Sequence, residues 1–317
     1  MVLAAGLGTR LRPLTLEIPK PAVPVLGCPL CGYAMEFLHT HGATEFLLNL
    51  HHGPDAVRQR VDAWAAGRFP VAYAFEPEIL GTGGGIGNAR EFLKGGTFLV
   101  ANSDVIARFP LDEALDRHRE SGALATLVLF PDPGKRYTPV RAREDGSVTG
   151  FGEDAPGGAF EGFFTGYQII EPELLEHIPR GRPSCIVRET YAPLIARGAP
   201  IRAFRTSGAF LDFGTPADYL AGAISLLGGL DGGGRKNAGR VFIAPGARVD
   251  PSASVGPDAA IESGAVVEAG ARVRRAIVWP GARVAPGAVV ENGILTPRQF
   301  VPAGWPPLAP SIPPRSM

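Results

Sequence analysis

Two glycines and two cations near the start of the chain have the types and spacing to bind phosphate. Gly6 and Gly8 follow the apolar run Met1–Ala5, and Arg10 and Lys20 come soon after. Close glycines permit positive φ and let the backbone approach a ligand, and the N–H groups of such a turn form an anion-binding concavity. Arg10 offers paired donors to phosphate oxygens, and Lys20 offers a point charge between two prolines. The stretch therefore predicts a phosphate-binding loop after a buried strand.

The loop is neither a Walker loop nor a dinucleotide fingerprint, because the lysine and third glycine of those motifs are missing at the required spacing. The full string Leu-Ala-Ala-Gly-x-Gly-Thr-Arg-Leu-x-Pro-Leu-Thr, followed by Pro-Lys-Pro, resembles the signature of the sugar-nucleotide pyrophosphorylases, or nucleoside-diphosphate-sugar synthases. The resemblance implies that Arg10 and Lys20 are catalytic. It also implies nucleotide contacts for Leu3, Ala4, Ala5, Gly6, Gly8 and Thr9.

The family reaction joins a sugar 1-phosphate oxygen to the α-phosphorus of a nucleoside triphosphate and releases pyrophosphate. It requires charge neutralisation and in-line positioning more than a strong base. The resemblance implies Mg²⁺ as the cofactor, held by Asp104 in Asn-Ser-Asp-Val and by Asp212 in Phe-Leu-Asp-Phe-Gly-Thr-Pro. Either aspartate alone could instead cap a turn or a helix.

A second glycine-rich stretch, Leu-Gly-Thr-Gly-Gly-Gly-Ile, begins at Leu80. It resembles the family loop that passes beside the base and the sugar, which implies nucleotide contacts for Gly81, Thr82 and Gly83. The alternative is an ordinary turn at the entry to a helix.

The match to the family is weaker on the sugar side. Asn102, Glu153, Thr165 and Gly166 are the implied sugar contacts, but Asp154 stands where the family carries a lysine. Arginine could replace that lysine, and the candidates are Arg141, Arg143 and Arg188.

The first two thirds of the chain alternate between apolar strand-like runs and segments of helical periodicity. This alternation predicts an α/β fold with a mostly parallel, Rossmann-like sheet and helices on both faces. Because ligands bind beyond the carboxyl ends of parallel strands, Gly6 and Asp104 should lie at one rim. An antiparallel insertion is expected over residues 140–170. The expected strands are 1–5, 44–50, 71–75, 97–101, 123–130, 201–204 and 210–213, and the expected helices are 29–41, 55–66, 84–93, 111–121, 171–178, 187–197 and 216–227.

A different pattern fills the last part of the chain. Aliphatic residues recur every six positions from Ile243 to Val273 and, after a slip of one residue, from Val278 to Val290. Alanine follows most of them four positions later, a pattern typical of a left-handed parallel β-helix. Open coil ends favour self-association, so a homo-oligomer is expected. The predicted domains are a catalytic domain over 1–227, a glycine-rich linker over 228–240 that few contacts should cross, a β-helix over 241–295 and a proline-rich tail over 296–317.

Composition excludes several classes of function for this chain of 317 residues. Lys+Arg and Asp+Glu both number 31, which gives no support for a nucleic-acid or anionic-membrane partner. No apolar run reaches the ~18 residues of a membrane span, and no basic segment of a secretory signal precedes the first apolar run. The pair Cys28 and Cys31 lacks a second pair to complete a zinc site. A cytoplasmic protein fits these observations.

The sequence therefore predicts a magnesium-dependent sugar-1-phosphate nucleotidyltransferase. The segments around Asp104 and Asp218, with the C-terminal repeat, resemble guanylyltransferases that make GDP-mannose. The stretches around Thr82 and Phe164 look more like uridylyltransferases that act on amino-sugar 1-phosphates. Those enzymes usually lack a β-helix, so the repeat favours guanylyl transfer. A thymidylyl specificity or a non-catalytic sensor of nucleotide sugars is also open. An acyltransferase is disfavoured because no repeat carries a histidine.

Overall fold

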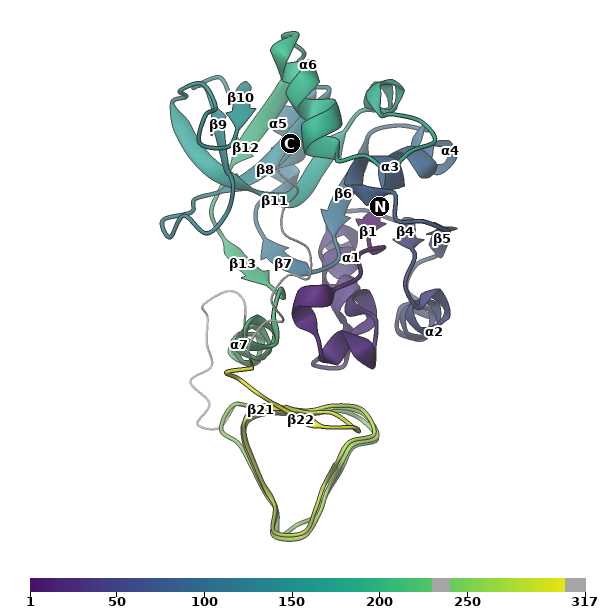
Figure 1. The fold of residues 1–317 in the computed structure, drawn as a ribbon, viewed down its shortest axis with the longest axis vertical. Coiled ribbons are helices and arrows are strands. Elements are labelled where there is room, and N and C mark those ends of the chain that lie inside the picture. Colours follow the sequence, from purple (N-terminus) through teal and green to yellow (C-terminus); the bar gives the residue numbers. More distant parts are fainter. Residues whose placement is uncertain (230–239, 306–317) are drawn as a thin grey trace. The chain divides into compact units, whose positions relative to one another are not determined.

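The structure is a computed structural model that describes residues 1–229 and 240–305 (Figure 1). It divides into two compact units, each formed from separated stretches of chain. Unit 1 consists of Met1–Gly6 and Cys31–Phe210, and unit 2 consists of Leu7–Leu30 and Leu211–Met317. The break after Gly6 assigns the first glycine of the predicted phosphate loop to unit 1 and the second to unit 2.

Four parallel strands form one half of the main sheet of unit 1, in the order β6-β1-β4-β5. Val2 pairs with Leu48 on one side and with Ala101 on the other. Such central strands are covered on both faces, which explains why Phe46–Leu50 is entirely buried. The bounds are β1 Val2–Leu3, β4 Phe46–Leu50, β5 Val71–Phe75 and β6 Phe98–Asn102.

Helices connect these parallel strands, as the alternating pattern predicted. In α2, Val57, Val61 and Ala65 are buried at four-residue spacing, so one face packs inward. The helix α5 ends at Gly122, whose φ of 58° is left-handed. The bounds are α1 Leu30–Thr40, α2 Pro54–Ala65, α3 Gly81–Asn88, α4 Arg90–Leu93 and α5 Leu111–Ser121. The predicted α/β fold with a mostly parallel sheet is confirmed for this core.

The expected antiparallel insertion is also present, and it enters the sheet through β11. This long strand is antiparallel to β6, β8 and β9, and β8 pairs in parallel with β12. The strands of this part are β8 Ala125–Phe130, β9 Pro139–Ala142, β10 Val148–Phe151, β11 Phe160–Ile170 and β12 Ile201–Arg205. The short strand β7 Val105–Arg108 lies outside this sheet. Between β11 and β12 lie a 3-10 segment η4 Pro172–His177, a π-helical turn η5 Ile186–Tyr191 and α6 Ala192–Ala196, where longer α-helices were expected.

Unit 2 begins with the loop that carries the predicted phosphate-binding residues. This loop contains three 3-10 turns and a small strand pair, and it is followed in the unit by the end of β13 and by α7. The bounds are η1 Thr9–Leu11, η2 Leu14–Leu16, η3 Lys20–Ala22, β2 Pro24–Val25, β3 Cys28–Pro29, β13 Ala209–Asp212 and α7 Pro216–Leu227.

The C-terminal strands stack in parallel, and Figure 1 shows them end on as a triangle. Ile243 lies over Ile261, which lies over Val278 and then Leu295, so successive strands are separated by 18, 17 and 17 residues. The interval first shortens to 17 between Ile261 and Val278, where the sequence pattern slips by one residue. The strands are β14 Val241–Ile243, β15 Arg248–Val249, β16 Ser254–Val255, β17 Ala259–Ile261, β18 Val266–Val267, β19 Arg272–Val278, β20 Arg283–Val284, β21 Val289–Leu295 and β22 Phe300–Pro302.

The expected tail over residues 296–317 needs correction. The tail expected from Thr296 contains β22, which pairs antiparallel with β21 and so extends the stacked sheet. Long-range pairing at the end of a sheet gives no periodic signal in so short a segment. The predicted linker over 228–240 lies almost entirely outside the described residues.

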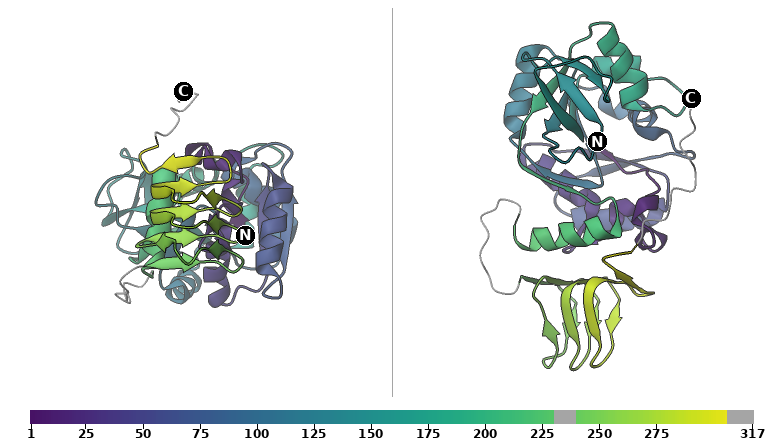
Figure 2. Two further views of the ribbon diagram at one scale, coloured as in Figure 1. Left: turned by 90° about the horizontal axis from the view of Figure 1, so that it is seen from below. Right: turned by 60° about the vertical axis from the view of Figure 1, so that its left-hand side comes forward.

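The expectation of few contacts between the C-terminal strands and the preceding chain is also wrong. Within unit 2, Trp279 Nε1 donates to the Tyr219 hydroxyl at 2.9 Å, and that hydroxyl donates to the Pro24 carbonyl at 2.5 Å. The Gly27 N–H donates to Glu262 at 3.0 Å, and Thr296 Oγ1 donates to Glu17 at 2.6 Å. Figure 2 shows α7 running along the stacked strands. The C-terminal strands therefore help to hold the loop of residues 7–30.

The described residues contain no helix that is both long and apolar enough to cross a membrane.

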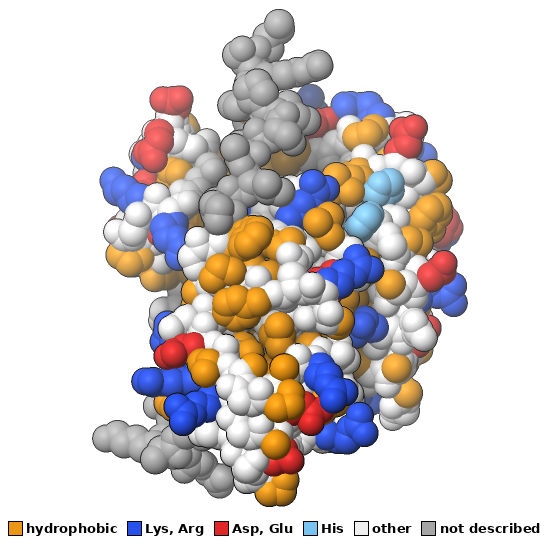
Figure 3. All heavy atoms as spheres, turned by 60° about the horizontal axis from the view of Figure 1, so that its bottom comes forward, with side chains coloured by type: hydrophobic (Ala, Val, Ile, Leu, Met, Phe, Trp, Pro, Cys, Tyr) orange, Lys and Arg blue, Asp and Glu red, His pale blue; other side chains and the backbone are white. Residues whose placement is uncertain are grey.

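Figure 3 shows a face on which apolar side chains gather with charged side chains around them. In the C-terminal strands, Val241, Ile243, Val289 and Phe300 are the exposed large apolar residues.

Candidate functional site

The glycine turn of the predicted phosphate loop is fixed by its own neighbours in unit 2. Gly8 has a φ of 61°, and a Cβ placed there would lie 2.9 Å from the Cβ of Lys20 and 3.0 Å from a Thr15 methyl. The Gly8 carbonyl accepts hydrogen bonds from the Leu11 N–H at 3.0 Å and from Thr15 Oγ1 at 2.9 Å. Only glycine combines this backbone with this packing, and the turn thereby holds the stem of Lys20, which is 8% exposed.

Arg10 and Asp212 meet at a second glycine of unit 2. A Cβ on Gly214 would lie 3.0 Å from an Arg10 guanidinium nitrogen and 3.3 Å from an Asp212 carboxylate oxygen. Arg10 is exposed and Asp212 is half-buried, so both groups are accessible to a ligand. The structure therefore brings together the predicted catalytic arginine and one predicted metal ligand.

The segment after Asp212 is ordered by a helix cap. Thr215 is the N-cap of α7; its hydroxyl accepts from the Asp218 N–H at 3.2 Å, and the Asp218 carboxylate accepts from the Thr215 N–H at 3.1 Å. This reciprocal arrangement satisfies two donors at the helix start. It gives Asp218 a local structural role and fixes the chain leading from Gly214 into α7.

In unit 1, a bulge in β11 brings Gly166 against Asn102. The register of β11 against β8 shifts between Phe164 and Gln168. Gly166 has a φ of 86°, and a Cβ there would lie 2.3 Å from the Asn102 amide nitrogen. Thr165 anchors the bulge, because its hydroxyl donates to the Val128 carbonyl at 2.9 Å. The predicted sugar contacts Asn102, Thr165 and Gly166 are therefore neighbours.

Asp104 follows Asn102 by two residues in the sequence and lies in the two-residue turn after β6. Its side chain is half-buried. Burial raises the pKa of the nearby Tyr167 hydroxyl, and the negative charge of Asp104 raises it further, while Arg108 and a backbone contact with Ala107 oppose the change. Because β6 is parallel to β1, Asp104 lies beyond the carboxyl end of a parallel strand, where ligands of such sheets bind.

The glycine-rich stretch forms the helix α3, and a neighbouring segment of unit 1 clamps its start. The N–H groups of Gly83 and Gly84 donate to the Ser184 carbonyl at 2.9 and 3.3 Å. Thr82 Oγ1 accepts from the Ile186 N–H at 3.0 Å, and a Cβ on Gly81 would lie 2.7 Å from the Ser184 carbonyl oxygen. Close packing against Ser184 thus explains why Gly81 and Gly83 are glycines. The nucleotide contacts of these residues remain a prediction.

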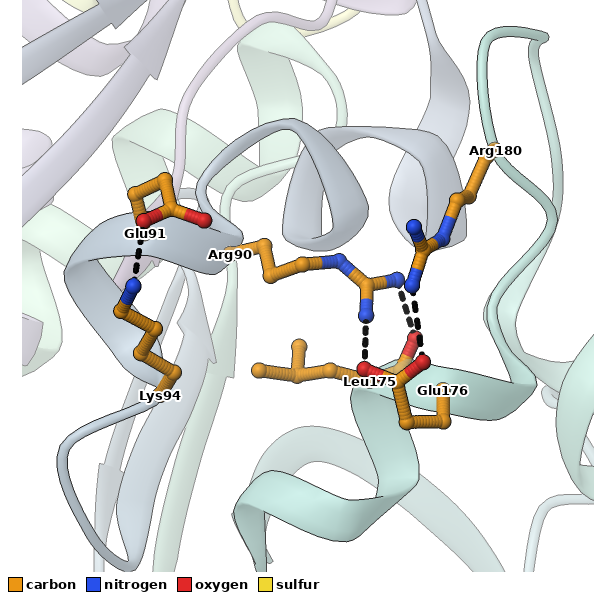
Figure 4. A network of polar contacts seen from close by, with 6 residues as sticks. All are labelled: Arg90, Glu91, Lys94, Leu175, Glu176 and Arg180. Carbon is orange, nitrogen blue, oxygen red and sulfur yellow. Dashed lines mark hydrogen bonds and ion pairs between the residues drawn. The ribbon is translucent and has the colours of Figure 1, made fainter.

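Ion pairs hold α4, the helix that follows α3, against residues 175–180 (Figure 4). Arg90 from α4 and Arg180 both point at Glu176, at 2.6 and 2.7 Å. Arg90 also donates to the Leu175 carbonyl. These contacts tie α4 to the segment that leads into the Ser184 clamp.

Glu153, the remaining predicted sugar contact, is exposed and lies just after β10, the second strand of the β9–β10 hairpin. The Arg141 guanidinium donates to the Glu153 carbonyl at 2.8 Å and to the Glu161 carboxylate at 2.9 Å. Arg141, one of the arginines considered as a substitute for the family lysine, is therefore next to Glu153.

Sequence reasoning missed two buried polar residues, Asn49 and Glu76. Asn49 is 2% exposed in the middle of an apolar strand, and Glu76 is fully buried directly after β5. A polar residue at a buried strand position is the signal that could have identified Asn49, since such groups need a partner. Glu76 adjoins the glycine stretch, yet its burial could not be read from the sequence.

The parallel strand order β6-β1-β4-β5, with helices between the strands and a glycine turn after β1, defines an α/β protein of the class that binds ligands beyond its strand ends. A family model described as "Nucleotidyl transferase" matches residues 1–227, and one described as "GMPPB C-terminal domain" matches residues 237–303. The chain belongs to the nucleotidyl transferase family, which confirms the resemblance noted in its sequence.

Curated relatives include enzymes with two different base specificities. Mannose-1-phosphate guanylyltransferase of Mycobacterium tuberculosis is 32% identical over 233 residues, which are 73% of this chain and 65% of that protein. UTP–glucose-1-phosphate uridylyltransferase of a Synechocystis species is 31% identical over 238 residues, 69% of this chain and 61% of that protein. The chain thus spans slightly less than two thirds of the length of these relatives.

Solved structures share the fold. HddC from Yersinia pseudotuberculosis superposes with a TM-score of 0.61 at 25% identity, covering 71% of this chain and 97% of that chain. Another structure of the same protein, complexed with GMP-PN, matches with the same TM-score at 26% identity.

Proposed function

We propose that the protein transfers a nucleotidyl group from a nucleoside triphosphate to a sugar 1-phosphate and releases pyrophosphate. GTP and mannose 1-phosphate are the proposed pair, giving GDP-mannose. The observation that carries the proposal is the family match over residues 1–227, which includes the glycine turn packed on Lys20. The similarity to mannose-1-phosphate guanylyltransferases supports the choice of substrates.

In this proposal the backbone around Leu3–Gly6, Gly8 and Thr9, with Gly81–Gly83, binds the nucleotide. Arg10 and Lys20 neutralise the phosphate oxygens as negative charge redistributes toward the leaving pyrophosphate. The packing of Gly8 on Lys20 supports this role, because a side-chain stem that is already packed loses less conformational entropy when its ammonium group binds phosphate.

The donor chemistry of Asp104 and Asp212 fits Mg²⁺. Magnesium is commonly bound by one or two carboxylates together with substrate phosphates, so a dedicated protein cage is unnecessary. The described residues hold no cluster of three or more His, Cys, Asp or Glu side chains that could bind a metal ion. When bound, Mg²⁺ would neutralise phosphate charge, and the two aspartates would hold it.

Asn102, Thr165 and Gly166 are proposed to bind the sugar. The Asn102 amide offers a donor and an acceptor to hydroxyls, and the left-handed Gly166 permits a close backbone approach. Glu153 is proposed as a further sugar contact, with Arg141 beside it in place of the family lysine.

Initial rates with GTP, UTP, dTTP, CTP and ATP against mannose, glucose and glucosamine 1-phosphates test the proposal, with pyrophosphate release as the readout. We expect the highest kcat/KM for GTP with mannose 1-phosphate, and no release after removal of divalent cations. A preference for UTP would favour uridylyl transfer, which the Synechocystis relative supports. A site that hydrogen-bonds guanine should discriminate against uracil by about 10⁴.

We further propose that the stacked C-terminal strands form a left-handed β-helix of hexapeptide repeats. The near-regular strand intervals and the triangular outline support this assignment (Figure 1). Exposed apolar residues at the strand edges, such as Ile243 and Phe300, support association into a homo-oligomer. The proposed nucleotide substrates fit a cytoplasmic location.

A further inference from the structure

A buried carboxylate lies between two segments that the proposed function assigns to the nucleotide. Glu76 is fully buried, and its Oε2 accepts from the Leu80 N–H at 3.0 Å, directly before α3. Its Oε1 accepts from Asn49 Nδ2 at 2.8 Å. Both donors are neutral, so the carboxylate is held by hydrogen bonds to an amide side chain and to the backbone.

Asn49 extends this chain of hydrogen bonds to the end of β1. Its Oδ1 accepts from the Ala4 N–H at 2.8 Å. The series Ala4 N–H, Asn49, Glu76 and Leu80 N–H therefore connects the strand that enters the phosphate loop to the start of the glycine helix. All four residues belong to unit 1.

The glycine helix rests directly on this pair. A Cβ on Gly85 would lie 2.7 Å from Asn49 Nδ2 and 2.9 Å from Glu76 Oε1. The Glu76 backbone is held as well, because its N–H donates to the Leu50 carbonyl at 2.7 Å and its carbonyl contacts His51 Nδ1 at 2.8 Å. A small shift of either side chain would therefore move the helix.

A buried carboxylate paired with neutral donors is costly compared with an apolar residue, so it is a poor device for stability alone. It is well suited to fixing geometry, since each carboxylate oxygen accepts from a different donor, one on β4 and one at the start of α3. We propose that Asn49 and Glu76 are positioning residues that set the spacing between the Ala4–Gly6 segment and the α3 glycine helix, and thereby the affinity for the nucleoside triphosphate. This inference rests on the proposed function.

A swap of donor and acceptor tests the pair. In Glu76→Gln, the new NH₂ group must face either the Asn49 NH₂ or the Leu80 N–H, so one buried donor loses its acceptor. In Asn49→Asp, two carboxylates face each other. In the double variant, the introduced glutamine can donate its NH₂ group to the introduced aspartate, and its amide oxygen can accept from the Leu80 N–H. The aspartate can still accept from the Ala4 N–H, so all three hydrogen bonds return.

Steady-state KM for GTP and for mannose 1-phosphate, with thermal melting, is measured for the full chain and these variants. Each single variant should raise the KM for GTP about 10-fold or more, because Glu76→Gln loses one buried hydrogen bond and Asn49→Asp loses one and adds repulsion between two carboxylates. The KM for mannose 1-phosphate should change less than about threefold, and the double variant should recover most of the GTP affinity. Glu78→Gln, an exposed neighbour, is the matched control and should leave both constants unchanged.

The outcomes separate the two hypotheses. An active wild-type chain whose single variants melt lower but keep the KM for GTP overturns the positioning role and leaves the proposed function intact. Equal losses for both substrates, or no recovery in the double variant, overturn it too. A wild-type chain that uses no tested substrate pair overturns the proposed function together with the role assigned to this pair.

Discussion

Removing the hydroxyl of Tyr219 should loosen the loop that carries Lys20. Tyr219 and Trp279 are both fully buried, and the tyrosine hydroxyl is the only group removed in Tyr219→Phe. That hydroxyl accepts from Trp279 Nε1 at 2.9 Å and donates to the Pro24 carbonyl at 2.5 Å. The variant therefore leaves one buried donor and one buried acceptor without this hydrogen-bond partner while keeping the aromatic ring.

A buried polar group that loses its hydrogen-bond partner costs about 1–3 kcal/mol. Because two groups lose a partner here, the free energy of unfolding of unit 2 should fall by about 4 kcal/mol. At about 2–4 °C per kcal/mol, the melting temperature should drop by about 8–16 °C. The aromatic ring keeps its edge contact with Trp279, with centroids 6.1 Å apart, so loss of packing adds little.

Differential scanning calorimetry of Tyr219→Phe, Trp279→Phe and the double variant measures the coupling between the two side chains. We expect a coupling energy of about 1–3 kcal/mol. Tyr73→Phe is the matched control, because its hydroxyl bonds to Asp62 in an exposed position at 2.6 Å. A melting point for Tyr219→Phe within about 2 °C of wild type would refute the reasoning that links α7 to the loop.

Three further predictions follow from the proposed site. Asp104→Asn and Asp212→Asn should each lower kcat by about 10² or more at moderate magnesium, because each removes one carboxylate from the cation; this is measured by pyrophosphate release. Lys20→Ala should lose nucleotide affinity and rate, and the salt dependence of nucleotide binding should weaken with it. Burial raises the pKa of the Cys31 thiol to about 12, so at pH 8 iodoacetamide should label Cys185 long before Cys31 in the native protein.

Controls make these outcomes decisive. Asp116→Asn removes an exposed carboxylate of α5 and should leave turnover unchanged. Near-normal turnover of Asp212→Asn at saturating magnesium would exclude it as a ligand. A collapsed melting curve for Lys20→Ala would make that lysine structural, and equal labelling of the three cysteines in native protein would contradict the burial of Cys31.

Local patterns predicted most of the elements that position the site. The apolar run before Gly6, the buried strand 46–50 and the helix that buries Val57 and Val61 each carry their own periodicity. The six-residue repeat likewise predicted which aliphatic residues stack, since Ile261 and Val278 share a register position. These features depend on neighbours within a few residues.

Features created by long-range pairing were not predictable in the same way. The β11 bulge that brings Gly166 to Asn102 depends on register against β8. The Asn49–Glu76 contact joins residues 27 apart in the sequence. Trp279 and Tyr219 lie 60 residues apart, and neither carries a local sign of its partner. Tertiary contacts, rather than propensity, decide such features.

The division of unit 2 into residues 7–30 and 211–317 has a consequence for how the protein is made. During translation, unit 1 can assemble around β1 once residue 210 has left the ribosome. The loop bearing Arg10 and Lys20 must wait for α7 and the stacked strands, which at about 5–20 residues per second means tens of seconds after its own synthesis. A nascent chain therefore has a nearly complete sheet before Arg10 and Lys20 reach their final positions. Chains truncated late in synthesis should accumulate with a folded sheet but without a folded phosphate loop.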